Sequence, residues 1–257
     1  MALLETLIAT QTLAPPKLLL YGPPGAGKTT FAASAGAVLV DCENGAGTVP
    51  GLRRTPYLES WRQMREWLVE MATANATNIR VVAVDTLDWM IHRITEHVVV
   101  DLDKKSPQEI TNTLGTAHGG YYRAREVVLN VVSRELFPLF NAITSRGAAV
   151  LLLAHAAHTR MTTPEGYDLR LAAPDLPSWI APMFIEWADA VLYIQHAENR
   201  RRLQCVSSNV VLAKNRYSLP AELPLDWPAL MGHIVGQMSP PKPAPAANEE
   251  SEDEIPY

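Results

Sequence analysis

The chain has 257 residues, and its apolar fraction of 47% with 19% charged residues is ordinary for a soluble globular protein with one sizeable core. The formal net charge of -5 lies mostly in segment 240–257, which holds five acids and one lysine, so the charge of the remaining chain argues neither for nor against nucleic acid. The two cysteines exclude a disulfide framework, and residues 1–20 have neither the pattern of a signal peptide nor that of a membrane span, so we expect a cytoplasmic protein.

The first half of the chain alternates apolar runs of strand length with segments of helical periodicity. Glycine-rich residues 22–27 separate the first strand from the first helix. In chain order we expect a strand at 17–21, a helix at 28–35, a strand at 37–41, a helix at 60–74, a strand at 80–85 and a helix that ends near 100. Such alternation predicts parallel strands joined by crossover helices.

The second half contains two stretches that we expect to be long loops, at 101–120 and 156–177. Loops of this length inside a compact domain are more often functional than accidental. Around them we expect a helix at 121–145, a strand at 148–154, a helix at 178–187 and strands near 190–196, 201–206 and 210–213, the first two joined as a hairpin around Asn199. The predicted fold is therefore α/β, a mostly parallel sheet flanked by helices, with antiparallel strands near its C-terminal end.

The sequence divides into three segments. Residues 1–16 form an N-terminal lead, residues 17–237 form one domain, and residues 238–257 are rich in proline, alanine and acids. The last segment has too few apolar residues to bury a core, so we expect it to be disordered.

The strongest motif is a phosphate-binding loop. Gly22-Pro23-Pro24-Gly25-Ala26-Gly27-Lys28-Thr29 matches G-x-x-x-x-G-K-[ST] at every fixed position and lies between an expected strand and an expected helix. Its glycines let backbone N–H groups wrap around phosphates, Lys28 can reach the β- and γ-phosphates, and the Thr29 hydroxyl can bind Mg²⁺. We expect ATP and Mg²⁺ at this loop, with Thr30 as a further nucleotide contact.

Two carboxylates at strand ends are candidates for the remaining chemistry. Asp85 ends an apolar strand, where it would accept a hydrogen bond from a magnesium-bound water; alone, such an aspartate is more often a helix cap. Glu43 follows the strand after the phosphate loop and could activate the water that attacks the γ-phosphate; the alternative is a solvated glutamate that opens a loop.

These elements together resemble the RecA-like recombinases. The pattern consists of the phosphate loop, a next strand that ends in Asp41-Cys42-Glu43, a third strand that ends in Asp85, a glycine-bearing stretch at 114–120, and the runs Val150 to His155 and Val210 to Arg216. Over residues 17–220 the chain is most similar to the short phage-type ATPases of single-strand annealing and recombination. It differs in carrying His155 where these proteins commonly have glutamine.

The resemblance implies further site residues. His155 would report the state of the γ-phosphate; the alternative is a hydrogen-bonded structural histidine. Lys214 and Arg216, at alternate positions of a late strand, would reach the ATP of a neighbouring subunit in a ring or filament; a solvated edge strand would look the same.

In the family that this chain resembles, the two long loops approach single-stranded DNA. The second loop carries arginines and a tyrosine, which suit phosphate contact and base stacking, although ordinary solvated loop charges would look alike. The candidate DNA contacts are Arg123, Arg160, Tyr167 and Arg170.

The acidic C-terminal segment ends in Ile255-Pro256-Tyr257 and resembles the tip of bacterial single-stranded-DNA-binding proteins. That resemblance implies recruitment of host proteins that bind such tips, with an acidic run for steering and one apolar end for burial. The alternative is a tail that only improves solubility.

The sequence thus predicts a weak, DNA-stimulated ATPase that acts on single-stranded DNA in recombination or annealing, forms homo-oligomers and has no membrane association. Two alternatives stay open: a hexameric helicase-like motor, and an assembly factor that binds ATP without hydrolysing it. A comparison of ATPase rates with and without single-stranded DNA separates these classes.

Overall fold

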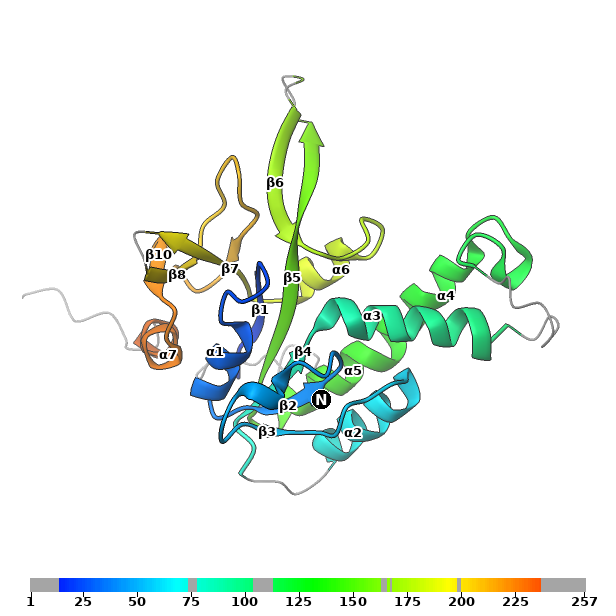
Figure 1. The fold of residues 1–257 in the computed structure, drawn as a ribbon, viewed down its shortest axis with the longest axis horizontal. Coiled ribbons are helices and arrows are strands. Elements are labelled where there is room, and N and C mark those ends of the chain that lie inside the picture. The colour runs from blue at the N-terminus through cyan, green and yellow to red at the C-terminus, as the bar shows by residue number, and fades with distance from the viewer. Residues whose placement is uncertain are drawn as a thin grey trace, which may run out of the picture.

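A computed structural model of the protein describes residues 14–73, 78–103, 113–162, 166, 168–197 and 200–236. Its centre is a mixed sheet in which β7, β1, β5, β4, β2 and β3 lie side by side in this order and pair in parallel (Figure 1). These strands are β1 (Lys17–Gly22), β2 (Val38–Asp41), β3 (Arg53–Arg54), β4 (Val81–Asp85), β5 (Ala149–Thr162) and β7 (Ala190–Ala197). This is the mostly parallel α/β sheet that the sequence predicts.

Antiparallel strands extend the sheet toward the C-terminal end of the chain. They are β8 (Arg200–Gln204) and β9 (Lys214–Asn215), which both pair with β7, and β10 (Glu222–Pro224), which pairs with β8. A further antiparallel strand, β6 (Asp168–Pro174), pairs with the outer half of β5.

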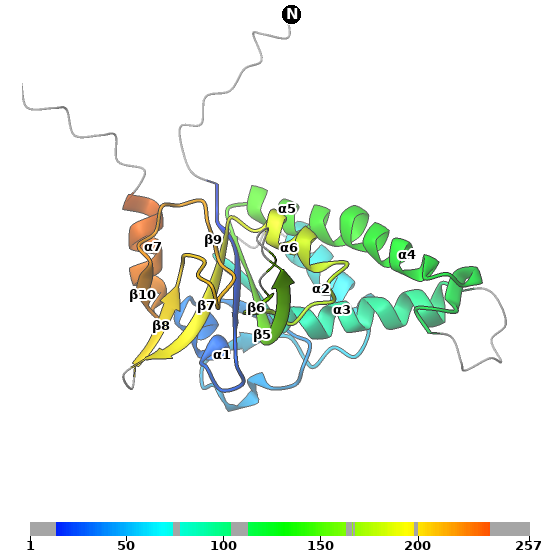
Figure 2. The same cartoon turned by 90° about the horizontal axis from the view of Figure 1, so that it is seen from above.

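Helices cover both faces of the sheet (Figure 2). On one face lie α1 (Lys28–Ser34) and α7 (Trp227–Gly236). The other face carries α2 (Trp61–Thr73), α3 (Leu87–Glu96), α4 (Arg123–Val131), α5 (Phe137–Ser145) and α6 (Ala181–Trp187). Short helical turns complete the chain: η2 (Ala46–Thr48), η3 (His97–Asp101), η4 (Ala117–Gly119) and η5 (Val132–Leu136).

The strand sequences explain why both faces are covered. Leu18 and Leu20 of β1 belong to the core under α1 and α7, whereas Leu19 and Tyr21 belong to the core on the opposite face. All four are fully buried. Since alternate strand residues point to opposite faces, a run that is apolar at every position must be covered on both sides.

One continuous helical stretch within the described residues, Arg123–Ser145, is long and apolar enough to cross a membrane, with a mean hydropathy of 1.2 over its most apolar window. One such helix is weak evidence for a span. Val128, Leu136 and Phe140 from this stretch are fully buried in the core, so one face of the stretch packs against the body of the protein.

The expected loop at 156–177 is wrong. β5 continues to Thr162 and forms an antiparallel hairpin with β6, with Ala156 opposite Pro174 and Thr162 opposite Asp168. The added part of β5, Ala-Ala-His-Thr-Arg-Met-Thr, mixes residues of weak and strong strand preference without a regular apolar alternation, so the partner strand, and not the local sequence, decides this element.

Four other elements also differ from the sequence prediction. The strand expected at 210–213 is wrong, because the ladder with β7 forms one step later at β9 and Val211 makes only an isolated bridge with Ala172. The short strands β3 and β10 and helix α7 were not predicted. For α7 the sequence does carry a signal: Asp226 accepts a hydrogen bond from Ala229 N–H, and Leu230 and Ile234 are spaced for one buried face.

Candidate functional site

The phosphate-binding loop connects β1 to α1. Gly25 and Gly27 have φ angles of 72° and 102°, a region that favours glycine. Gly22 is closely packed, because a Cβ at this position would lie 3.1 Å from Cβ of Ile194 on β7. The glycines of the motif therefore meet conformational and packing demands of this loop.

Lys28 opens α1 and its ammonium lies inside the loop. Its Nζ donates hydrogen bonds to the carbonyl oxygens of Gly22, at 3.0 Å, and Pro23, at 3.2 Å, and the residue is 7% exposed. Burial lowers the pKa of Lys28, while the nearby carboxylates of Asp85 and Asp88, and more weakly Glu43, act in the opposite direction. A desolvated cation is thus held at the centre of the loop.

Thr29 and Asp85 come together although 56 residues separate them. The Thr29 hydroxyl donates to Oδ2 of Asp85 at 2.7 Å. Asp85 ends β4 and is 6% exposed; burial raises its pKa to about 6, against the lowering effect of the Thr29 hydrogen bond. The peptide bond from Asp85 to Thr86 is cis.

Asp41 shapes the turn that carries Glu43. Its Oδ1 accepts hydrogen bonds from the backbone N–H groups of Glu43 and Asn44, at 3.3 and 2.7 Å. Its Oδ2 accepts a 2.9 Å bond from Nη1 of Arg54. Asp41 is 1% exposed, so this is a buried cap for the turn rather than a solvated acid.

Glu43 faces the end of β4 and the middle of β5. Its Oε2 accepts a hydrogen bond from the Thr86 hydroxyl at 3.3 Å, and its Oε1 lies 3.7 Å from Nε2 of His155. The Glu43 side chain is 34% exposed, so water can reach the carboxylate. A partly hydrated carboxylate between a hydroxyl and an imidazole has the surroundings of a general base.

Asp88 holds His155 in place and was not predicted from the sequence. Its two carboxylate oxygens accept the His155 backbone N–H at 3.0 Å and face the ring Nδ1 at 2.8 Å. Because a carboxylate accepts, the proton is assigned to Nδ1, which leaves Nε2 directed at Glu43. His155 also pairs in register with Gly22, so it stands beside the first residue of the phosphate loop. The sequence feature that could have identified Asp88 is its position in the first turn of α3, three residues after Asp85.

The residues present fit a magnesium nucleotide. Among the described residues, no group of three or more His, Cys, Asp or Glu side chains is arranged to hold a metal by itself. Mg²⁺ does not need such a cluster beside a nucleotide, since it binds one or two protein groups together with phosphates and water. The hydroxyl of Thr29 against the carboxylate of Asp85 is a donor set of that kind.

Lys214 and Arg216 lie at the end of the strands that is opposite to the phosphate loop. Lys214 pairs with Val191 and Asn215 with Ala190 at the start of β7, whereas the phosphate loop follows the end of β1. The Lys214 ammonium donates to three carbonyl oxygens, of Ile185, Glu186 and Ala188, at 2.7 Å each. Arg216 forms a 3.4 Å ion pair with Asp189. The two residues are close to each other and remote from the phosphate loop of their own chain.

The predicted DNA contacts fall in two places. Arg160 and Arg170 are exposed and directly opposite each other in the β5–β6 hairpin, which projects from the body at the top of Figure 1. Arg123 is exposed at the start of α4, on the right of the same view. Tyr167 lies outside the described residues, and so does the C-terminal tip Ile255, Pro256 and Tyr257.

Next to Arg123 are two aromatic residues that the sequence analysis did not single out. Tyr121 is 93% exposed and Tyr122 is 55% exposed, and both have positive φ angles. The guanidinium of Arg125 lies 4.1 Å from the ring centroid of Tyr122. Exposed aromatic rings beside arginines are the components of a single-strand stacking surface.

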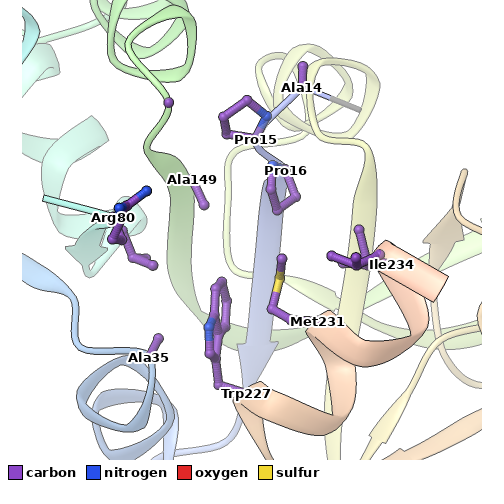
Figure 3. Close-up of a pocket in the computed structure, with 12 residues that line it drawn as sticks. Ala14, Pro15, Pro16, Ala35, Arg80, Ala149, Trp227, Met231 and Ile234 are labelled. Carbon is purple, nitrogen blue, oxygen red and sulfur yellow. The ribbon is translucent and has the colours of Figure 1, made fainter. Parts of the chain in front are cut away.

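An apolar cavity of about 280 Å³ lies at the opposite end of the central strands (Figure 3). Trp227 and Met231 of α7 face Pro16 and Ala149 across it, with Arg80 at its edge. No residue of the phosphate loop lines this cavity, so it is separate from the nucleotide site.

One protein family and a solved structure are similar to this chain. The model of a family described as an AAA domain matches residues 14–217. The crystal structure of the RadB recombinase is similar to this chain with a TM-score of 0.42 and 15% sequence identity, over 78% of this chain and 86% of that one. No curated protein matches.

Proposed function

Because the chain belongs to this AAA domain family, we propose that it is a magnesium-dependent ATPase of RecA-like fold that acts on single-stranded DNA in recombination or strand annealing. The 2.7 Å hydrogen bond between Thr29 and Asp85, beside the buried ammonium of Lys28, carries the proposal. It joins the end of the phosphate loop to the end of β4, as a phosphate site with magnesium requires.

In this proposal Lys28 and the loop backbone bind the phosphates, while Thr29 and Asp85 hold the metal. Magnesium, when bound, supplies positive charge that balances the charge of the phosphate oxygens. The Lys28 ammonium exchanges its two loop carbonyls, those of Gly22 and Pro23, for phosphate oxygens. That exchange is favourable because hydrogen bonds between charged partners are stronger than those to neutral carbonyls.

Glu43 removes the proton from the attacking water. Thr86 donates to one of its oxygens and so fixes the carboxylate, and the other oxygen lies toward His155. Asp88 fixes the imidazole of His155, which leaves Nε2 directed at Glu43. We infer that His155 senses the γ-phosphate through Glu43, as a positioning residue.

The β5–β6 hairpin is the proposed DNA contact. Arg160 and Arg170 face each other across the ladder, and like charges in directly opposite positions are destabilising unless an anion lies between them. Asp168 offsets little of this repulsion, since its ion pair with Arg160 is 3.8 Å long and Arg160 is 80% exposed. Phosphates of a single strand would supply the missing anion.

For action across a subunit boundary in a homo-oligomer, Arg216 is the better candidate. Its side chain is 56% exposed and its ion pair is long. Lys214, in contrast, is engaged by three carbonyls within its own chain.

Two substitutions test the nucleotide site. We expect Lys28→Ala to abolish the binding of magnesium ATP in calorimetry. We expect Glu43→Gln to keep binding within a few-fold and to lower the hydrolysis rate by about 10²- to 10⁴-fold, because it removes only the general base. Glu66→Gln, on the exposed face of α2, is the matched control. Wild-type protein that does not bind magnesium ATP, or a Glu43→Gln variant that hydrolyses it normally, would contradict the assignment.

A further inference from the structure

Strand β8 begins with three consecutive arginines that have different surroundings. Because side chains alternate across a strand, Arg200 and Arg202 point to one face of the sheet and Arg201 to the other. Arg202 donates to Oε2 of Glu222 at 2.8 Å. Arg201 shares its face with Leu203, which belongs to the core under α1 and α7. Arg201 is therefore the arginine of the three that faces the helix that follows the phosphate loop.

The Arg201 side chain lies directly against Gly27 of that loop. A Cβ built on Gly27 would be 2.8 Å from Nη1 of Arg201 and 3.6 Å from its Cδ, with Leu225 at 3.3 Å on the same side. Any larger residue at Gly27 would displace the guanidinium. The absence of a side chain at Gly27 thus permits the arginine to lie across the last glycine of the phosphate loop.

This guanidinium has no anionic partner in the described part of the chain. Arg201 is exposed, and among the described residues its side chain makes neither a hydrogen bond nor an ion pair, although its backbone pairs with His196 in the ladder. An exposed, unpaired cation beside a loop with a phosphate-binding motif is placed to interact with a bound polyanion.

We propose that Arg201 is a phosphate-binding residue of the nucleotide site, supplied in cis by strand β8. The inference rests on the proposed function, because it requires that the phosphate loop binds a nucleotide. The planar guanidinium can bind phosphate oxygens with two parallel hydrogen bonds, which the point charge of Lys28 cannot do.

The position of Arg201 also determines which step it affects. Arg201 comes from β8, which lies beyond β7 on the side of β1 away from β5. Glu43 and His155 contact each other on the opposite side of β1, near β5 and β4. Arg201 therefore strengthens nucleotide binding, and proton removal from water remains with Glu43. Its loss raises the dissociation constant of the nucleotide.

The test compares Arg201→Gln with Arg200→Gln in the full chain. Both variants lose one positive charge from the same strand, but only Arg201 touches the loop. We expect Arg201→Gln to weaken magnesium ATP and magnesium pyrophosphate by about 10- to 100-fold in calorimetry, as for a hydrogen bond between charged groups. We expect Arg200→Gln to bind both as the wild type does, and Arg201→Lys to recover part of the loss. Thermal unfolding without ligand checks that both Gln variants are folded.

Each result decides between the possibilities. Equal binding by Arg201→Gln and the wild type, while Lys28→Ala abolishes binding, would overturn the role of Arg201 and leave the proposed function in place. A loss for ATP without a loss for pyrophosphate would overturn the phosphate contact. Equal losses of affinity in both Gln variants would show that the effect comes from net charge alone and would overturn the contact. Wild-type protein that binds neither ligand would overturn both proposals.

Discussion

At the scale of single residues, Asp85 is held in surroundings that disfavour its charge. It is 6% exposed, and burial raises its pKa from 3.8 to about 6. Between these values the folded protein binds more protons than the unfolded chain, so this group stabilises the fold as the pH falls from about 6 to about 4. Above pH 6 the ionised carboxylate destabilises the fold by up to about 3 kcal/mol. A metal ion bound to Asp85 would compensate this negative charge and so relieve the destabilisation.

Because the charge of Asp85 destabilises the fold, we expect Asp85→Asn to raise stability but to weaken the binding of magnesium nucleotide. Without nucleotide at pH 8 we expect the variant to melt at a higher temperature than the wild type, and the difference to shrink at pH 5, where the wild-type carboxyl is neutral. The variant should also lose the magnesium-dependent part of its ATP affinity. Wild-type affinity for magnesium ATP should fall as the pH drops below about 6.

The measurements are thermal unfolding at the two pH values and calorimetry with and without magnesium. Asp175→Asn, at an exposed position, serves as the control. A stability difference that is the same at pH 8 and pH 5 would contradict the assigned titration of Asp85.

Lys214 has a structural role that can be measured apart from catalysis. Its ammonium satisfies three carbonyls around the end of α6, where the negative end of a helix favours a cation. We expect Lys214→Met to lower the free energy of unfolding by about 1 to 3 kcal/mol, because the carbonyls lose their donor. Urea unfolding without nucleotide measures this.

Arg216→Gln is the companion variant to Lys214→Met, since it removes only a 3.4 Å, half-exposed ion pair and should cost less than about 1 kcal/mol. A Lys214→Met variant as stable as the wild type would show that the ammonium is free to act elsewhere. A lower ATPase rate in Arg216→Gln, at unchanged stability, would support its action across a subunit boundary.

At the scale of elements, the β5–β6 hairpin is the clearest difference between expectation and structure. The inner half of β5 pairs with β1 and β4 and is buried from Ala149 to Ala154, so its Leu-rich sequence predicts a strand. The outer half leaves the body and pairs only with β6, where polar and charged residues are tolerated. Its strand identity comes from a partner whose pairing the local sequence does not reveal.

The hairpin gives a prediction about DNA. We expect the double substitution Arg160→Gln and Arg170→Gln to weaken single-stranded DNA binding and to reduce the slope of log affinity against log salt by about 1.4, as two lost phosphate contacts require. Stability should stay the same or rise, because the like charges opposite each other are removed.

Arg62→Gln with Arg134→Gln is the matched control, since it makes the same charge change at exposed positions on the helices. Fluorescence titration of a labelled oligonucleotide at several salt concentrations measures all three proteins. An equal change of slope in the control pair would show that the hairpin is not the contact.

At the scale of the whole molecule, the sheet order explains why the site assembles. The phosphate loop and Glu43 follow the carboxyl ends of β1 and β2, and Asp85 is the last residue of β4. His155 lies in β5 level with Gly22. Parallel strands place all these ends at one edge of the sheet, which is where α/β proteins bind ligands. Residues far apart in the sequence meet there without any local contact between them.

The segment that follows α7 gives a prediction about partners. We propose that residues 17–237 act as one domain and that the tip Ile255-Pro256-Tyr257 recruits proteins that bind the tips of single-stranded-DNA-binding proteins. Deletion of 255–257 should leave ATP binding unchanged, since α7 already ends at Gly236, and should abolish capture of such a partner. A deletion variant that captures the partner as well as the full chain does would leave the tail as a solubilising segment.

The sequence by itself determined the parallel core and the phosphate loop, because both depend on local rules. Continuous apolar runs require burial on both faces, and a glycine-rich turn before a helix requires residues that are close in the chain. The clustering of Thr29 with Asp85 also followed, since strand ends in a parallel sheet share an edge. Only the tertiary structure brought Asp88 to His155, Arg201 to Gly27 and Lys214 to the end of α6. These contacts join residues far apart in the chain, and they depend on side-chain positions that no local pattern specifies.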